Sequence, residues 1–198
     1  MNILYGVQAT GNGHISRSRE IVGCLNEMGH SVFVILSGRD PADLWDMDVF
    51  KPFTTFKGLT FTTYKGKVRY IRTALNLGLT QFYKDIKSFD ASQYDIAVTD
   101  FEPVTARIAK KFNLPAIGVG HQYAFYHDIP KAGSNPVANF VIKNFAPVDY
   151  PIGLHWHHFN KPILPPVVPR FDTDEIDSID NKILVYLPFE ELEDILQL

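Results

Sequence analysis

Short runs of apolar residues alternate along this chain with longer segments in which apolar positions recur at helical spacing. The first run, Asn2–Gln8, leads through a glycine-bearing turn into 16–28, where Ile21, Leu25 and Met28 mark one helix face. The same reading predicts four more buried strands, at 31–36, 95–99, 116–120 and 148–154. It predicts three more helices between them, at 67–89, 102–112 and 135–145. This order predicts an α/β fold with a doubly wound, mostly parallel sheet, in which ligands bind at the carboxyl ends of the strands.

The turn after the first strand carries the strongest candidate chemistry. Its two glycines let the backbone adopt positive φ or approach a ligand closely, and the first N–H groups of the following helix suit an anion. His14 lies at the mouth of this site. Histidine ordinarily titrates near a pKa of about 6.5, so a neutral imidazole is available as a base at pH 7. We expect substrate contacts from this segment, through Gly11, Asn12, Gly13, Ser16 and Arg17.

Polar residues also follow two later strands. Asp100 and Glu102 come after 95–99, and His121 and Gln122 come after 116–120. Because the carboxyl ends of parallel strands share one edge, these residues are expected to line the same cleft, where Glu102, His121 and Gln122 would contact substrate. Asp100 can also be read as the N-cap of the next helix. His121 can equally well serve a structural hydrogen bond.

Two metal sites are conceivable but poorly supported by the pattern. Asp100 and Glu102 resemble an acidic pair that could hold magnesium or manganese around a diphosphate. The glycine-bearing turn favours phosphate binding without a metal instead. The histidines around Trp156 lack acidic or cysteine partners at useful spacing for zinc. No metal and no cofactor is therefore predicted.

Composition narrows the class of protein. The chain has 198 residues, 45% hydrophobic and 21% charged, which is ordinary for a folded soluble domain. A net charge of -3 offers no general reason to expect nucleic acid. The single cysteine excludes a disulfide framework. No apolar run approaches the roughly 20 residues that span a bilayer, and the chain starts with a strand in place of a signal sequence, so a cytoplasmic location is predicted.

Charge is unevenly distributed along the chain. Cations dominate 57–87 and are interleaved with aromatic residues, whereas acidic residues dominate 171–198. The basic stretch is either a solvated helix face or a surface for an anionic ligand or the acidic inner face of a membrane.

The pattern changes after Leu154. Four prolines fall within 162–169, an acidic segment follows, and a buried strand restarts at 182–188 with a helix from Glu190. We therefore expect one Rossmann-like domain at 1–170, with 171–198 forming a linker and the start of a second, truncated α/β domain. A fragment of this kind could self-associate into a homo-oligomer through a face that the missing part would cover.

The turn Gly11-Asn12-Gly13-His14 resembles the glycine-rich, histidine-ended loop of GT-B glycosyltransferases, especially the lipid-intermediate N-acetylglucosaminyltransferase of peptidoglycan synthesis and the UDP-glycosyltransferases. The spacing from 95–100 through a helix to 114–119 is similar to the acceptor domain of the same families. The likeness covers 1–170, and 180 onward resembles the start of the nucleotide-sugar domain. Asn12 stands where the peptidoglycan enzyme tends to have glycine, and Ser16 where it often has proline.

The resemblance implies a specific activity. It implies the Rossmann-like, acceptor-side half of a GT-B fold in an inverting, metal-independent sugar transferase. A UDP-sugar or similar nucleotide sugar would be the donor, and a glycan or lipid-linked molecule the acceptor. His14 would be the general base, and Asp100 would accept the other imidazole N–H and orient the ring. A chain lacking the nucleotide-sugar half would be inactive by itself.

The sequence leaves two other classes of protein open. A dinucleotide-dependent oxidoreductase also opens with a strand and a glycine turn, but Ser16 replaces the third glycine of the fingerprint and Arg39, not an acidic residue, follows the second strand. Only an NADP-dependent form using Arg39 fits. A non-catalytic ligand-binding module is the third class.

Overall fold

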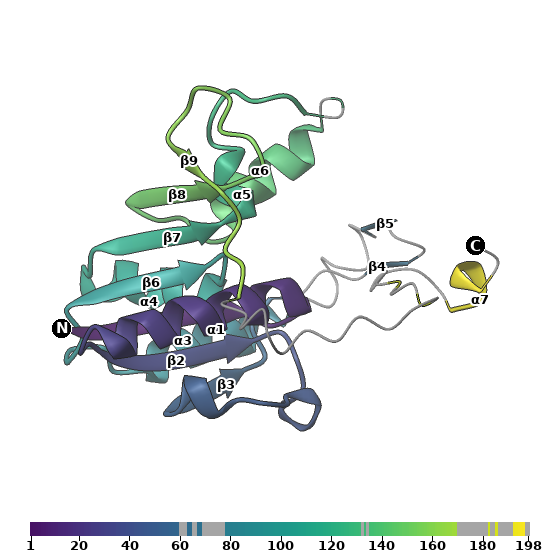
Figure 1. Cartoon of the computed structure of the whole chain (residues 1–198). Helices are drawn as coiled ribbons and strands as arrows, with labels where there is room; N and C mark the ends of the chain where they lie inside the picture. The colour runs from purple at the N-terminus through teal and green to yellow at the C-terminus, as the bar shows by residue number, and fades with distance from the viewer. Residues whose placement is uncertain are drawn as a thin grey trace.

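The computed structural model describes residues 1–59, 63–64, 67–68, 78–131, 133, 135–169, 182, 185 and 192–196. A seven-stranded sheet in the order β3-β2-β1-β6-β7-β8-β9 forms its centre (Figure 1), and every neighbouring pair is parallel. The strands are β1 (Asn2–Gln8), β2 (Ser31–Ser37), β3 (Phe53–Phe56), β6 (Ile96–Asp100), β7 (Ala116–Gly120), β8 (Tyr150–Leu154) and β9 (Ile163–Leu164). The predicted parallel α/β fold is confirmed.

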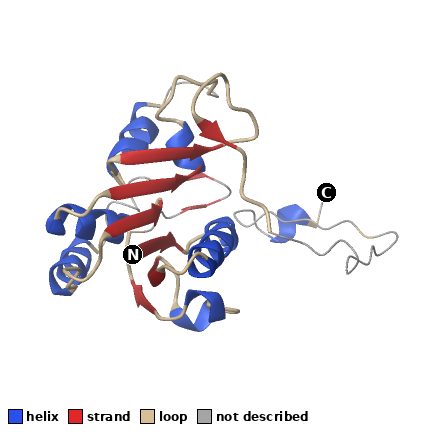
Figure 2. Ribbon diagram, turned by 60° about the vertical axis from the view of Figure 1, so that its left-hand side comes forward, coloured by secondary structure: helices blue, strands red, loops and turns tan. Residues whose placement is uncertain are grey.

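Helices cover both faces of this sheet, as Figure 2 shows. α1 (Asn12–Glu27) packs on one face, and α3 (Leu79–Ser88) and α4 (Pro103–Phe112) pack on the other. Successive side chains of a strand point to opposite faces. Tyr5 and Val7 therefore join the core beneath α1, while Leu4 joins the core beneath α3 and α4. A sheet buried on both faces explains why the strands read as continuous apolar runs.

The remaining elements are short. The 3₁₀ turns η1 (Pro41–Asp43) and η2 (Asp48–Phe50) connect β2 to β3, and β4 (Thr63–Tyr64) pairs antiparallel with β5 (Lys67–Val68). α5 (His121–Ala124) directly follows β7, and α6 (Pro136–Asn144) precedes β8. α7 (Leu192–Ile195) is the last described helix. No helix in the described part of the chain is long and apolar enough to cross a membrane.

Several predicted boundaries differ from the structure. α1 begins at Asn12, four positions before the predicted start, because the glycine turn itself enters the helix. The helix predicted over 67–89 is wrong at its start, since Lys67–Val68 is a strand and α3 begins at Leu79. β3 and β9 were not predicted, because runs of four and two residues show little periodicity. The strand predicted at 182–188 lies almost wholly outside the described residues.

The strand order reverses between β1 and β6, the point that positions the site. Chain order runs outward from β1 to β2 and β3 on one side, and from β6 to β9 on the other. Crevices at such a switch point, beyond the carboxyl ends of the strands, are where ligands bind in open α/β sheets. The turn into α1 leaves β1 here, and Asp100 is the last residue of β6.

Candidate active site

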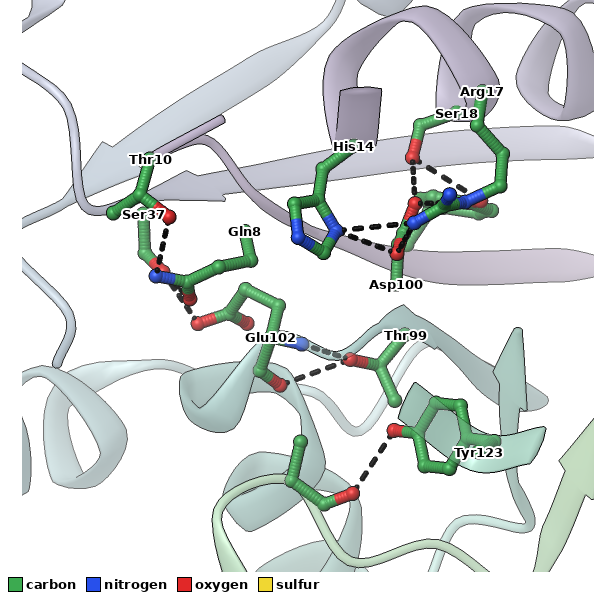
Figure 3. Close-up of polar contacts among 12 residues, drawn as sticks. Gln8, Thr10, His14, Arg17, Ser18, Ser37, Thr99, Asp100, Glu102 and Tyr123 are labelled. Atoms are coloured by element: carbon green, nitrogen blue, oxygen red, sulfur yellow. Dashed lines mark hydrogen bonds and ion pairs between the residues drawn. The ribbon is translucent and has the colours of Figure 1, made fainter. Parts of the chain in front are cut away.

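His14 and Asp100 meet across the switch point (Figure 3). The imidazole Nδ1 of His14 lies 2.8 Å from Oδ1 of Asp100. His14 comes from the first turn of α1 and Asp100 from the end of β6, and the parallel pairing of β1 with β6 brings the two segments together. The Asp100 side chain is fully buried, whereas that of His14 is 16% exposed. The pair thus has one closed end and one end open to solvent.

Two further residues of α1 bind the same carboxylate. The Arg17 guanidinium donates in a fork, with Nε 2.8 Å from Oδ2 and Nη2 2.6 Å from Oδ1 of Asp100. The Ser18 hydroxyl donates to Oδ2 at 3.1 Å. Residues three and four positions apart share one helix face, so His14, Arg17 and Ser18 all reach toward β6. Asp100 therefore accepts four hydrogen bonds.

These contacts decide the charge of Asp100. Burial by itself would raise the pKa of this carboxyl group, since it penalises the charged form. The charge that His14 carries when its ring is protonated and its hydrogen bond, together with the hydrogen bond and charge of Arg17, outweigh burial and hold the pKa of Asp100 below its ordinary value. Asp100 is therefore an ionised acceptor, which cannot donate to its neighbours.

The proton arrangement of His14 follows from that charge. An ionised carboxylate only accepts hydrogen bonds, so Nδ1 of the imidazole must carry the proton that it donates to Asp100. In a neutral ring the other nitrogen, Nε2, is then the one with a free lone pair. Figure 3 shows this nitrogen pointing away from Asp100. The geometry is that of an oriented base.

The turn before His14 is open to solvent. Gly11 is the N-cap residue of α1 and has an extended backbone. No side chain of the described residues caps this end of the helix. The first N–H groups of α1 other than that of His14, which donates to the Gly11 carbonyl, are thus available to an anion. Asn12, Gly13 and Ser16 are exposed. Asn12 accepts a hydrogen bond of 2.8 Å from Arg39, the residue that an NADP-dependent enzyme would use.

Glu102 lies apart from this pair. Its side chain is fully buried and caps α4, accepting the N–H groups of Val104 and Thr105 at 2.7 and 2.6 Å and the Ser37 hydroxyl at 2.7 Å. Burial raises the pKa of the Glu102 carboxyl above 4.5, against the opposing effect of these donors. The cap of α4 is therefore Glu102 and not Asp100, which corrects the alternative interpretation of Asp100.

The backbone at Phe101 separates the two acidic side chains. Phe101 has φ of 53°, in the left-handed region that residues other than glycine rarely adopt. The chain turns there, so that Asp100 contacts α1 while Glu102 contacts β2 and the start of α4. Neither carboxylate is exposed, and each is already satisfied by protein donors. The expectation that Glu102 contacts substrate is not favoured by this placement.

The two residues after β7 have different surroundings. His121 is exposed, lies with Nδ1 3.1 Å from the Leu154 carbonyl and stacks on His155. The buried Oε1 of Gln122 accepts no hydrogen bond from the described residues. A Cβ on Gly120 would stand 3.2 Å from Asp100 Oδ1, 3.4 Å from Gln122 Oε1 and 3.7 Å from Arg17 Nη2. Gln122 thus converges on the His14 cluster, whereas no contact in the described structure connects His121 with it.

The described residues hold no group of three or more histidine, cysteine, aspartate or glutamate side chains placed to bind a metal. The histidines around Trp156 instead use their rings locally, since Nδ1 of His155 and of His157 each accept a backbone N–H two residues ahead. Ser18, which donates to Asp100, and Ser37, which donates to Glu102, are polar partners that the sequence did not single out. Helical spacing from His14 could have indicated Ser18, whereas nothing local indicated Ser37.

Comparison with known proteins connects this chain to a family. The family model described as glycosyl transferase family 1 matches residues 1–188. A search of curated proteins gave no match. Among solved structures, the Streptomyces sp. SF2575 glycosyltransferase SsfS6 complexed with thymidine diphosphate is similar, with a TM-score of 0.50, 13% identity, and coverage of 78% of this chain and 49% of that one.

Two other glycosyltransferase structures are similar at lower scores. Acinetobacter baumannii MurG has a TM-score of 0.46 and 12% identity, over 91% of this chain and 50% of that one. Phytolacca americana UGT2, complexed with UDP-2fluoro-glucose and pterostilbene, has a TM-score of 0.44 and 13% identity, over 73% of this chain and 45% of that one. The chain spans about half the length of these structures. It has the Rossmann-like fold of one half of a GT-B enzyme, and it belongs to glycosyl transferase family 1.

Proposed function

We propose that this chain is the acceptor-side domain of an inverting, metal-independent sugar transferase in which His14 is the general base. The observation that carries the proposal is the His14–Asp100 pair, which leaves Nε2 free at the switch point of the sheet. Family membership supports a nucleotide-sugar donor, for which a UDP-sugar is our choice. The acceptor is a glycan or lipid-linked hydroxyl.

The reaction needs one proton transfer and one substitution. Nε2 of His14 accepts the proton of the acceptor hydroxyl while the acceptor oxygen forms a bond to the anomeric carbon of the sugar. The bond from that carbon to the diphosphate oxygen breaks, and the nucleoside diphosphate leaves with the electron pair. Attack on the face opposite the leaving group inverts the anomeric centre. Asp100 orients the ring and stabilises the imidazolium that forms.

Positive partial charge near the leaving group can come from the protein itself. The uncapped N-terminus of α1, with Gly11, Asn12 and Gly13, offers N–H groups to an anion. Asp100 and Glu102 are buried and occupied by protein donors, which disfavours them as ligands of a divalent ion at the diphosphate. These features support catalysis without a metal.

The domain boundary belongs to the same proposal. We take 1–170 as the acceptor-side domain and 171–198 as a linker and the start of a nucleotide-sugar domain. The donor pocket of such an enzyme would lie mainly in the second domain. The 198-residue chain should then bind acceptor, bind UDP-sugars little, and transfer no sugar by itself.

The test is transfer of labelled sugar from a panel of UDP- and dTDP-sugars to glycan and lipid-linked acceptors. It compares the full-length gene product with the 198-residue chain, with and without EDTA, and determines the anomeric configuration of the product by NMR. Inverted product that survives EDTA is expected from the full-length protein. Retained configuration, or activity that EDTA abolishes and magnesium restores, would refute the mechanism. Acceptor binding without transfer by any form would favour a non-catalytic binding module.

Contact with a membrane through 57–87 stays a separate prediction. Of this stretch, Tyr83, Lys84 and Lys87 are exposed on α3, while the placement of Lys65, Arg69 and Arg72 lies outside the described residues. Co-sedimentation with vesicles of acidic phospholipid at two salt concentrations measures this contact, since exposed charges are screened over about 10 Å at 0.1 M salt. Binding that is unchanged when Lys67, Arg69 and Arg72 become serine would leave the stretch as a solvated surface. Homo-oligomerisation is measured by light scattering on the same samples.

A further inference from the structure

Arg17 contacts both members of the His14–Asp100 pair. Its Nη2 atom lies 2.6 Å from Oδ1 of Asp100 and 3.1 Å from Nδ1 of His14, and its Nε lies 2.8 Å from Oδ2 of Asp100. The Arg17 side chain is 16% exposed, so solvent screens these contacts only in part. A proton-accepting histidine therefore operates with a fixed cation beside it and a carboxylate that is already paired.

The contact between Arg17 and the ring is not a hydrogen bond in the productive arrangement. Guanidinium groups only donate, and Nδ1 of His14 already carries the proton donated to Asp100. Two donors thus face each other at 3.1 Å. The contact is tolerable for a neutral ring, because Nη2 directs a hydrogen to Asp100, but it is repulsive for an imidazolium.

The other groups around the cluster do not cancel this effect. Among the described residues, β6 contributes Asp100, α1 contributes Arg17 itself, and β1 contributes the Tyr5 hydroxyl behind Ser18. α5 adds the neutral Gln122 and the phenol of Tyr123, whose pKa burial raises. Burial likewise raises the pKa of Tyr5, so both phenols stay neutral. Among the described residues, Asp100 and Arg17 are thus the charged side chains that contact the His14 ring.

We propose that Arg17 is a positioning residue that fixes the Asp100 carboxylate by its fork and offsets its charge, keeping His14 an unprotonated base at neutral pH. The inference rests on the proposed function for its purpose, although the protonation of His14 can be measured without any substrate. An unopposed carboxylate would instead favour the imidazolium. Asp100 would then orient the His14 ring but also favour its protonated form, which cannot accept a proton from the acceptor.

The direct test follows the titration of His14 in the 198-residue chain labelled with ¹⁵N-histidine. Long-range ¹H–¹⁵N spectra distinguish the Nδ1–H tautomer from the imidazolium, and His14→Gln assigns the signal among the seven histidines. In the unaltered chain we expect Nδ1–H with a bare Nε2 at pH 7. In Arg17→Gln, the titration midpoint of His14 should rise by about one pH unit or more, because the positive charge that disfavours the imidazolium is lost.

Two variants control for charge and for fold. Arg19→Gln removes the same charge from the same helix, where Arg19 pairs 3.3 Å from the exposed Asp46, and should leave the midpoint unchanged. Arg17→Lys keeps the charge but loses the fork. Its midpoint should stay near that of the unaltered chain, while in the full-length protein kcat should fall about tenfold with little change in KM.

Three results would overturn the proposal. They are an imidazolium at pH 7 in the unaltered chain, a midpoint in Arg17→Gln that matches Arg19→Gln, and an unchanged kcat in Arg17→Lys. The first is readable even if Arg17→Gln does not fold. If the full-length protein transfers no sugar, the titration results still stand, so failure of the proposed function is distinguishable from failure of this inference.

Discussion

Nδ1 of His14 lies 2.8 Å from Oδ1 of Asp100, although 86 positions separate the two residues in the chain. Their meeting depends on the pairing of β1 with β6, the two strands at which the sheet order reverses. The contact joins a partly open imidazole to a fully buried carboxylate. Substitution of His14 therefore tests the proposed chemistry, whereas substitution of Asp100 tests the stability of the fold.

Loss of the proposed base should remove catalysis but not the fold. In the full-length protein, His14→Gln should lower turnover by roughly 10²-fold or more, the usual contribution of a general base. Asp100→Asn should act in the same direction but more weakly, since the base remains. Initial rates at saturating donor and acceptor measure the effect. His30→Gln is the control, and near-normal turnover in His14→Gln when chemistry is rate-limiting would remove His14 from the mechanism.

Removal of the buried carboxylate should cost stability. Asp100→Ala leaves the Arg17 guanidinium and the Ser18 hydroxyl without their shared acceptor, which should lower the free energy of unfolding by about 3 kcal/mol. Urea denaturation of the 198-residue chain measures this loss. Asp46→Ala, which breaks an ion pair whose carboxylate is half exposed, should cost less than about 1 kcal/mol. Equal losses in the two variants would contradict the assigned network.

The Asp100 carboxyl group should make the free energy of unfolding depend on pH. Its folded pKa is lowered, so its stabilising contribution is present above the ordinary value of 3.8 and is lost as the pH falls through the folded pKa. The stability difference between the unaltered chain and Asp100→Asn should therefore be largest near neutral pH and shrink in acid. Unfolding free energies from pH 7 downward measure it, and a difference that grows in acid would reverse the assigned sign.

Glu102 should show the opposite dependence. Burial raises its folded pKa above 4.5, so its contribution is fully present below 4.5 and is lost as the pH rises through the folded pKa. Glu102→Gln cannot titrate at this position. The free energy of unfolding of the unaltered chain should therefore fall relative to that of Glu102→Gln as the pH rises above 4.5. Thermal or urea unfolding of both forms across this range provides the measurement. A gap independent of pH would show that the Glu102 carboxyl has the same pKa in the folded and unfolded states, which contradicts the raised folded pKa.

Close packing at Gly6 should make alanine costly there. An added Cβ would stand 2.4 Å from Oγ1 and 2.6 Å from Cβ of Thr105, a stiff side chain at the start of α4. Gly6→Ala should destabilise the chain by about 2 kcal/mol or more through overpacking. Gly23→Ala, inside α1 with nothing within 4 Å of the new Cβ, should stabilise it by about 0.5 kcal/mol or more. Equal melting temperatures for the two variants would contradict this packing.

Periodicity predicts the strands and helices that are long and buried. Ser31–Ser37 and Ala116–Gly120 agree with the predicted runs within one residue, because a strand covered on both faces must be apolar throughout. The strands Phe53–Phe56 and Ile163–Leu164 were not predicted, because they are too short to show a local pattern and form only by pairing with β2 and β8. For long buried strands, the local sequence is enough to predict the type of element. The short strands at the sheet edges form only through pairing with a neighbour, which the local sequence does not encode.

The candidate residues divide along the same line. That His14 and Asp100 would lie at one edge followed from their places after two strands, since the carboxyl ends of parallel strands coincide. The family resemblance implied that Asp100 accepts an imidazole N–H of His14, but no pattern in the sequence indicated the other partners of Asp100. The sequence by itself determined a parallel α/β domain with a histidine-bearing turn at its ligand edge. Only the tertiary structure decided that Arg17 and Ser18 occupy Asp100 and that Glu102 caps α4, because hydrogen-bond partners are set by the approach of segments far apart in the chain.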